Sequence, residues 1–282
     1  MELAEQFEQL RPYLRRVAYS HLGSLSEAED VVQDAWLRLE GSNPDEIRDL
    51  RAWLTTVVSR LSLDVLTSAR ARREQYVGPW LPEPVVDAGD DPSHKTDLDE
   101  SVSMALLVVL ESLSPAERSA FLLHDVFGYS FEEVARVVER TPEATRQLAS
   151  RGRRAVEARR PRYPANDDEQ RAAVEAFLTA AREGDIARLI ELLDPDVVVT
   201  GDGGGLVPAV RTVIGAERVV QMFMAFTKRF PDFDGRIVDV NGAPGAVTVA
   251  DGDVSVLAFT LDGGRITALD VVRNPEKLGS LR

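Results

Sequence analysis

The sequence contains no cysteine among its 282 residues. This absence excludes disulfide bonds and zinc sites built on thiolates, and it fits a protein of the reducing cytoplasm. The only histidines are His21, His94 and His124, and their wide spacing gives no sign of a metal-binding cluster. We therefore expect neither a metal centre nor a bound cofactor.

Long apolar segments are also missing. No apolar run approaches the roughly 18 residues that a membrane-spanning helix needs. The first ten residues, MELAEQFEQL, are acidic and lack the basic and apolar regions of a signal peptide. The sequence therefore predicts a cytoplasmic protein without a membrane partner.

Positive charge is scarce, since the formal net charge is −14, but it is unevenly spread. The net charge is −3 over residues 1–78, −6 over 79–100, +2 over 101–164 and −7 over 165–282. Within residues 140–162, eight arginines stand against two glutamates. A short positive stretch in an acidic chain is typical of a nucleic-acid-binding element, although a solvated helix face has the same composition.

Residues 1–75 are predicted to form a helical domain. The stretch SLSEAED places Ser26 as the N-cap of a helix, with Glu29 at the third position of a capping box. A second long helix is expected from about Leu50 to Arg73. Its buried side is predicted from residues spaced by four: Trp53, Val57, Leu61 and Val65.

Residues 76–100 are predicted to be a linker. Four prolines and seven acidic residues make regular structure unexpected there. The linker nevertheless carries Trp80 and Leu81, two apolar side chains that call for a partner surface.

Residues 101–160 carry the local signals of a helix-turn-helix. Ser114, Pro115 and Glu117 have the N-cap, N1 and N3 pattern of a helix start, and Gly128 is placed to end that helix. Ser130 opens a second capping box, and Thr141-Pro142 opens a third, basic helix after a short turn.

A helical projection of that third helix separates a core side from a polar side. Ala144, Leu148 and Ala155 are expected in the core. The opposite side carries residues whose side chains can reach phosphates and base edges: Glu143, Arg146, Gln147, Ser150, Arg153 and Arg154. This pattern favours DNA binding.

After a second linker at 161–168, residues 169–282 change in character. Two helices between Gln170 and Leu193 are broken by Gly184-Asp185, and a further helix is expected around 216–228. Strands are predicted over residues 197–200, 207–214, 236–240, 246–250, 254–261 and 265–272. This order indicates an α+β cone with an interior cavity.

The C-terminal domain lacks the residues of acid–base catalysis. It contains no His, Tyr, Cys or Trp from residue 169 onward, so an Asp–His or Asp–Tyr pair cannot be assembled within it. Asp202, Asp239 and Asp270 are interpreted as turn or surface residues. We expect no catalytic residue, while binding of a small apolar ligand in the cone stays open.

Three segments together resemble a known family. AEDVVQDAWLRL (28–39), RAWLTTVVSRLSLDVL (51–66) and the helix-turn-helix of residues 114–158 resemble the two globular domains of extracytoplasmic-function sigma factors of bacterial RNA polymerase. Residues 169–274 resemble a SnoaL-like domain. WLPEP (80–84), DGGG (202–205) and NPEKL (274–278) are similar to marker motifs of the sigma-factor subgroup with a fused SnoaL-like tail, the SigJ type.

The resemblance implies roles for the two helical domains. Residues 1–75 would be sigma domain 2, whose Asp30, Gln33, Asp34 and Leu37 dock on the clamp coiled coil of the polymerase largest subunit. Residues 101–160 would be sigma domain 4, whose third helix reads the minus-35 element through the six polar residues named above. The residues implied in minus-10 recognition are Ser59, Arg60, Ser62, Arg70, Arg72 and Arg73.

The resemblance also implies that the SnoaL-like tail acts in cis in place of a separate anti-sigma protein. We expect the linker to dock on that tail through three motifs: Trp80, Leu81, Pro82, Glu83 and Pro84; Asp202, Gly203, Gly204 and Gly205; Asn274, Pro275, Glu276, Lys277 and Leu278. Packing of Trp80 on the nearer helical domain is the alternative. Leu206 departs from the subgroup, in which a lysine usually follows the glycines.

The leading hypothesis is therefore a sigma factor, monomeric when free, that binds core polymerase and promoter DNA under control of its own tail. A ligand-sensing helix-turn-helix regulator without sigma activity is the alternative, but it leaves residues 1–75 without a role. An enzyme with a DNA-binding appendage comes third.

Overall fold

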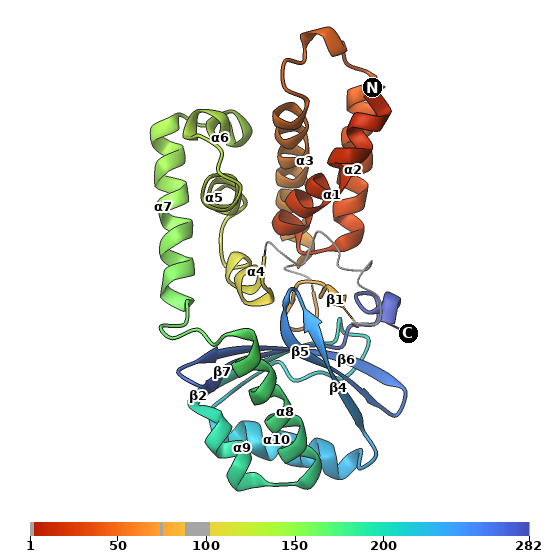
Figure 1. Cartoon of the computed structure of the whole chain (residues 1–282), viewed down its shortest axis with the longest axis vertical. Coiled ribbons are helices and arrows are strands. Elements are labelled where there is room, and N and C mark those ends of the chain that lie inside the picture. The colour runs from red at the N-terminus through yellow and green to blue at the C-terminus, as the bar shows by residue number, and fades with distance from the viewer. Residues whose placement is uncertain (1–2, 74–75, 88–101, 282) are drawn as a thin grey trace. The chain divides into compact units, whose positions relative to one another are not determined.

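The computed structural model describes residues 3–73, 76–87 and 102–281 (Figure 1). The chain folds into two compact units. The first contains Met1–Gln75, Thr96–Val102 and Leu106–Arg159, and the second contains Tyr76–Lys95, Ser103–Ala105 and Arg160–Arg282. The described part of the predicted linker, residues 76–87, thus belongs to the C-terminal unit.

The first three helices of the N-terminal unit are α1 (Leu3–Leu22), α2 (Leu25–Glu40) and α3 (Leu50–Arg73), and they pack on one another. The predicted N-cap of α2 is wrong by two residues. Ser24, not Ser26, caps the helix by accepting a hydrogen bond from the backbone N–H of Glu27. The chain turns early because Gly23 adopts φ +66°, which lets α2 start directly after α1.

Helix α3 buries more than the single stripe expected from its sequence. Trp53, Val57 and Val65 are only half-buried, whereas Leu54 and Val58 are fully buried. The difference arises because α3 packs against α1 and α2 and also against two later helices, α5 (Pro115–Phe121) and α6 (Phe131–Val138).

The second half of this unit contains α4 (Met104–Leu110), α5 (Pro115–Phe121), a π-helical turn (Leu122–Val126), α6 (Phe131–Val138) and α7 (Pro142–Arg159). Both predicted capping boxes, at Ser114 and Ser130, are confirmed by reciprocal side-chain and backbone hydrogen bonds. Gly128 has φ +76°, as a residue that ends a helix needs.

The core face predicted for α7 is wrong, because the buried residues lie one position later than expected. Thr145, Ala149 and Gly152 are buried, while Leu148 is only half-buried. A Cβ at Gly152 would lie 2.8 Å from Cβ of Phe121, so α7 lies too close to α5 at this position for a side chain.

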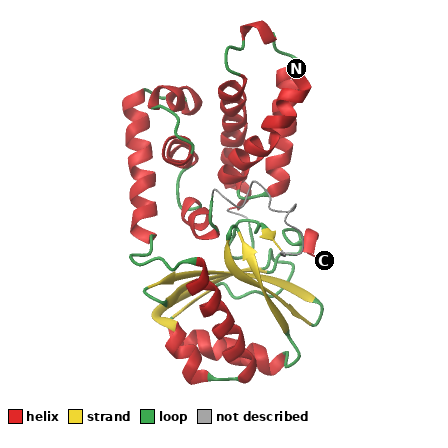
Figure 2. Ribbon diagram, in the orientation of Figure 1, coloured by secondary structure: helices red, strands yellow, loops and turns green. Residues whose placement is uncertain are grey.

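The C-terminal unit is a seven-stranded mixed sheet with helices on one face (Figure 2). The strand order is β1-β4-β5-β6-β7-β2-β3, and only the β2–β7 pair is parallel. The strands are β1 (Val86–Asp87), β2 (Leu193–Asp202), β3 (Thr212–Ile214), β4 (Asp234–Val240), β5 (Ala243–Ala250), β6 (Asp253–Asp262) and β7 (Arg265–Val272). The helices are α8 (Asp167–Glu183), α9 (Ile186–Leu192) and α10 (Ala216–Arg229), and a short 3-10 turn follows at Gly279–Leu281.

Two details differ from the sequence-based expectation. Strand β3 covers three residues instead of the eight predicted, and the linker contributes a strand of its own. That strand, β1, pairs antiparallel with β4, in the register Val86 to Val240 and Asp87 to Asp239. Regular structure forms within the proline-rich segment because Pro79, Pro82 and Pro84 precede the paired residues and leave their N–H groups free to bond.

Candidate functional sites

The face of α2 that was predicted to dock on a partner is open to solvent. Asp30, Gln33, Asp34 and Leu37 are all exposed, and Leu37 shows 57% of its surface. The opposite side, with Val31, Val32, Ala35 and Leu39, is buried. An exposed leucine between carboxylates and an amide is suitable for a basic helical partner that also offers an apolar contact.

The residues of α3 predicted to contact DNA do not form one open surface. Ser59 and Ser62 are completely buried, which corrects the expectation that their hydroxyls line a nucleic-acid strand. Arg60 is exposed, but its Nη2 donates a hydrogen bond to the carbonyl oxygen of Arg136 at 2.7 Å. The side chains of Arg70, Arg72 and Arg73 lie outside the described residues.

The polar side of α7 is exposed along its whole length. All six predicted residues face solvent: Glu143, Arg146, Gln147, Ser150, Arg153 and Arg154. Arg146 lies between Glu132 (3.6 Å) and Glu143 (3.8 Å), and the Nε of Arg153 donates to Asp125 at 2.8 Å. These exposed ion pairs are weak, so a phosphate could replace the carboxylates.

Arg118 is a buried residue that the sequence reasoning missed. Its guanidinium, from α5, donates to the carbonyl oxygen of His21 at the end of α1 (2.7 Å), to that of Leu110 (3.0 Å) and to the carboxylate of Glu111 (2.5 Å). Only 2% of the Arg118 side chain is exposed. An arginine in a helix start gives no sequence signal that it will be buried, because one of its acceptors, the carbonyl oxygen of His21, lies 97 residues earlier in the chain.

His21 is buried beneath this contact. Its Nδ1–H donates to the carbonyl oxygen of Val17 at 2.8 Å, and its Nε2 has no partner among the described residues. Burial lowers the pKa of His21 to about 4; the Val17 bond opposes this shift, and the charge of Arg118 adds to it.

A hydroxyl cluster also joins the two halves of the helical unit. The hydroxyl of Tyr129 donates to Thr55 on α3 at 2.8 Å and lies 3.1 Å from the hydroxyl of Tyr13 on α1. Burial raises the pKa of Tyr129. Together with the Arg118 contact to α1 and the Arg60 contact from α3, this cluster holds the later helices of the unit against α1 and α3.

The WLPEP segment lies on the C-terminal unit, where a buried ion pair holds it. The carboxylate of Asp202 is completely buried and lies 2.7 Å from Nζ of Lys277. The same carboxylate accepts hydrogen bonds from the backbone N–H of Leu81 (2.9 Å) and the hydroxyl of Tyr76 (2.6 Å). The Asp202 side chain therefore joins all three sequence motifs, which corrects its interpretation as a turn or surface residue.

Lys277 and its neighbours complete this contact. The Nζ of Lys277 also donates to the carbonyl oxygen of Leu81 and lies 4.0 Å from the ring centroid of Trp80. The side-chain amide of Asn274 donates to the Tyr76 hydroxyl at 2.9 Å. Burial and the bond to Asp202 raise the pKa of Tyr76, so its hydroxyl stays protonated and keeps donating. We call Tyr76, Trp80, Leu81, Asp202 and Lys277 the latch.

The remaining motif residues surround the latch. Pro82, Pro84 and Leu278 are buried, Glu83 and Pro275 are half-buried, and Glu276 is exposed. Gly203 is buried, Gly204 is half-buried and Gly205 is exposed. Gly204 has φ +66°, and a Cβ there would lie 2.6 Å from the Asn274 side chain, so glycine is required.

Asn241 holds the linker at a second point, through Val85, which the sequence did not predict. Its side-chain oxygen accepts from the N–H of Val85 at 3.1 Å, and its own N–H donates to the Val85 carbonyl oxygen at 2.8 Å. Leu206, which follows Gly203, Gly204 and Gly205 in the sequence, is 59% exposed. Of the other two interpreted aspartates, Asp270 is buried, and Asp239 pairs with Arg171 at 3.0 Å.

Two kinds of feature are absent from the described residues. No helix there is both long and apolar enough to cross a membrane. In the same residues, no three His, Cys, Asp or Glu side chains gather as metal ligands would.

Three family models match successive parts of the chain. Residues 6–72 match Sigma-70 region 2, residues 103–156 match Sigma-70 region 4, and residues 174–275 match the SnoaL-like domain.

Known proteins match over nearly the whole length. The ECF RNA polymerase sigma factor SigJ of Mycobacterium tuberculosis (strain H37Rv) is 44% identical, over 98% of this chain and 93% of its own. The probable ECF RNA polymerase sigma factor SigI of the same species is 34% identical, over 96% of this chain and 93% of its own. The crystal structure of M. tuberculosis SigJ superposes with a TM-score of 0.83 at 39% identity and covers 98% of both chains.

Proposed function

The chain belongs to the extracytoplasmic-function RNA polymerase sigma factors with a fused SnoaL-like domain, and from this premise we propose that its own tail controls its promoter-specific transcription. The SnoaL-like domain would act through the linker and without catalysis. The observation that carries this proposal is the buried Asp202–Lys277 pair, which fixes Leu81 of the linker to the tail.

In this proposal, the sigma domains use the surfaces expected from the sequence. The exposed face of α2 docks on core polymerase, the basic face of α7 reads the minus-35 element, and α3 contributes to minus-10 recognition. Since Ser59 and Ser62 are buried and Arg60 is bonded to Arg136, α3 has to lose its contacts with α5 and α6 before it can engage DNA.

Control through the linker follows from its position in the chain. Residues 76–100 are the only covalent connection between the two sigma domains, and their first part is bonded to the tail. Anchoring one end of that connection limits how far the two domains can separate, and they must separate to reach two promoter elements on one duplex. Release of the latch would lengthen the usable tether.

The test is run-off transcription with core polymerase. It compares the full chain with chains ending after about residue 164 and after about residue 273, and with Lys277→Met, which breaks the latch from the tail side. Lys228→Met, at an exposed site on α10, is the matched control. We expect promoter-directed transcripts from the full chain, and a yield changed several-fold by each truncation and by Lys277→Met but not by Lys228→Met.

Two results would count against the proposal. Failure of every version to bind core polymerase would remove the sigma role and favour a stand-alone DNA-binding regulator. Equal transcription by Lys277→Met, Lys228→Met and the unaltered protein would remove the latch as a control element, while the sigma role would stand.

A further inference from the structure

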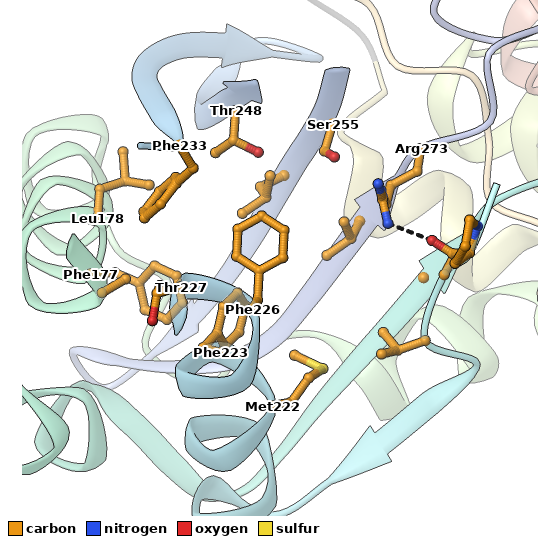
Figure 3. Close-up of a pocket in the computed structure, with 17 residues that line it drawn as sticks. Phe177, Leu178, Met222, Phe223, Phe226, Thr227, Phe233, Thr248, Ser255 and Arg273 are labelled. Carbon is orange, nitrogen blue, oxygen red and sulfur yellow. Dashed lines mark hydrogen bonds between the residues drawn. The ribbon is translucent and has the colours of Figure 1, made fainter. Parts of the chain in front are cut away.

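The SnoaL-like domain encloses a cavity that the proposed function does not use. Its volume is about 370 Å³, within the range of small-molecule binding sites. Aromatic and aliphatic side chains from α8, α10 and the sheet line most of it, among them Phe177, Phe223, Phe226 and Met222 (Figure 3).

Three polar side chains form one row in the wall of this cavity. Thr248 on β5 stands directly opposite Ser255 on β6, and Val256 pairs with Val272 on β7. Continuing that antiparallel register by one residue brings Arg273 beside Ser255. Figure 3 shows the three side chains along the same side of the cavity, with the guanidinium of Arg273 directed inward.

Arg273 is the single charged residue among those that line the cavity. Its Nη1 donates to the carbonyl oxygen of Pro208, and its Nη2 lies 3.3 Å from the carboxylate of Asp253. Asp253 is half exposed, with 47% of its side chain in solvent, so water screens that ion pair. The Nε–H of Arg273 is buried without a partner among the described residues.

A cationic side chain in a mostly apolar wall is costly to bury, and a ligand anion placed beside the guanidinium would lower that cost. One arginine and two hydroxyls can hold a single negative charge through charge-assisted hydrogen bonds. A ligand with two charges would bring one that this apolar wall leaves uncompensated.

We propose that this cavity binds a small, mostly apolar monocarboxylate, with Arg273 as the anchor of its carboxylate. Ser255 and Thr248 complete the polar end, and the phenylalanine rings of α8 and α10 pack on the apolar body. No step of this binding breaks or forms a covalent bond.

The same arginine connects the cavity with the latch. The backbone N–H groups of Arg273 and Asn274 both donate to the carbonyl oxygen of Asp202, at 2.7 and 3.0 Å. The carboxylate of Asp202 in turn holds Leu81 and Lys277. A ligand that orders Arg273 therefore also orders the strand end that holds the linker. This second step rests on the proposed function, whereas binding itself does not.

Isothermal titration calorimetry on the full chain tests the binding. The probes are phenylacetate, 2-naphthylacetate and decanoate, each compared with its neutral amide. We expect saturable binding of at least one acid and at least tenfold weaker binding of its amide. Arg273→Gln should abolish this preference, and Met222→Trp, which fills the cavity away from Arg273, should weaken both by tenfold or more.

Arg236→Gln is the matched control, because Arg236 is exposed on β4 and does not line the cavity. Circular dichroism checks that each variant is folded. Absence of binding by all three acids up to millimolar concentration, or an acid preference that survives in Arg273→Gln, would overturn the proposal.

Hydrogen exchange of residues 76–87 tests the connection with the latch. We expect saturating acid to slow this exchange several-fold in the unaltered protein and in Arg236→Gln. Unchanged exchange with the acid bound would overturn the connection. Neither experiment uses polymerase or promoter, so their failure is separate from failure of the sigma role.

Discussion

Nη1 of Arg118 donates a hydrogen bond to the carbonyl oxygen of His21, 97 residues earlier in the chain, at 2.7 Å. This bond joins the start of α5 to the end of α1, and thus the second sigma domain to the first. Replacing Arg118 by Met would keep its aliphatic volume but remove the guanidinium that donates to the His21 carbonyl oxygen and the Glu111 carboxylate. The Leu110 carbonyl oxygen would keep the backbone N–H of Leu113 as a donor. We expect the free energy of unfolding to fall by about 2–4 kcal/mol in urea titrations.

The matched control is Arg140→Met, which removes an exposed guanidinium that donates to the neighbouring carbonyl oxygen of Glu139. Hydrogen exchange in α3 should rise in Arg118→Met and stay constant in Arg140→Met. Equal stability of the two variants would show that Arg118 does not hold the domains together.

Acidification should destabilise the region around the Arg118–His21 hydrogen bond, because His21 becomes protonated. Its pKa is about 4 in the folded chain, below the ordinary value of 6.5, so the unfolded chain binds more protons between these two pH values. Stability is therefore fully present above pH 6.5 and is lost as the pH falls toward 4, by about 3 kcal/mol at most. Urea unfolding as a function of pH measures this loss.

His21→Gln should flatten that part of the stability profile, and His124→Gln, which keeps His21, should not. A slope that persists in His21→Gln would assign the acid sensitivity to other groups.

The close approach of α7 to α5 predicts a strong effect of a single methyl group. Gly152→Ala would place Cβ 2.8 Å from that of Phe121, so the helices have to move apart. We expect a loss of roughly 1–3 kcal/mol, larger than the gain in helix propensity of about 1 kcal/mol. In Gly41→Ala the new Cβ would lie 3.6 Å from the nearest atom, and we expect no loss. Thermal melting of the two variants shows whether the cost of the steric clash exceeds the gain in helix propensity.

The basic face of α7 predicts how binding to a minus-35 duplex depends on Arg146. If Arg146 contacts a base, Arg146→Ala should weaken specific binding by about 1–3 kcal/mol and relax specificity at one position. If it contacts a phosphate, binding to all sequences should weaken alike, and the salt slope should fall by about 1. Fluorescence anisotropy in a salt series separates the two, with Arg236→Ala as control. Unchanged affinity in Arg146→Ala would remove this residue from the interface.

Much of the architecture could be predicted because its signals are local. The capping boxes of Ser114 and Ser130 need only four residues each, and strands β4 to β7 are largely apolar runs joined by short turns. The exposed faces of α2 and α7 also follow from helical periodicity, which fixes one side once the other is apolar.

The incorrect predictions concern residues whose burial depends on contacts with distant parts of the chain. The buried face of α7 was missed because it includes Thr145 and Gly152, which carry no large apolar side chain to count. Ser59 and Ser62 are buried in a helix that packs both on α1 and α2 and on α5 and α6, far along the chain, so local periodicity could not predict their burial. Arg273 gave no signal either, since its role comes from strands β5 and β6 beside it and not from its neighbours in sequence.

Strand β1, which the linker contributes, covers the edge strand β4 for as long as the linker stays bound to the tail. Its two residues occupy the outer hydrogen-bonding positions of β4 at Val240 and Asp239. Departure of the linker would uncover an unpaired sheet edge, which readily adds a strand from another molecule. An unlatched protein is thus prone to self-association, and prompt capture by polymerase would be its protection against aggregation.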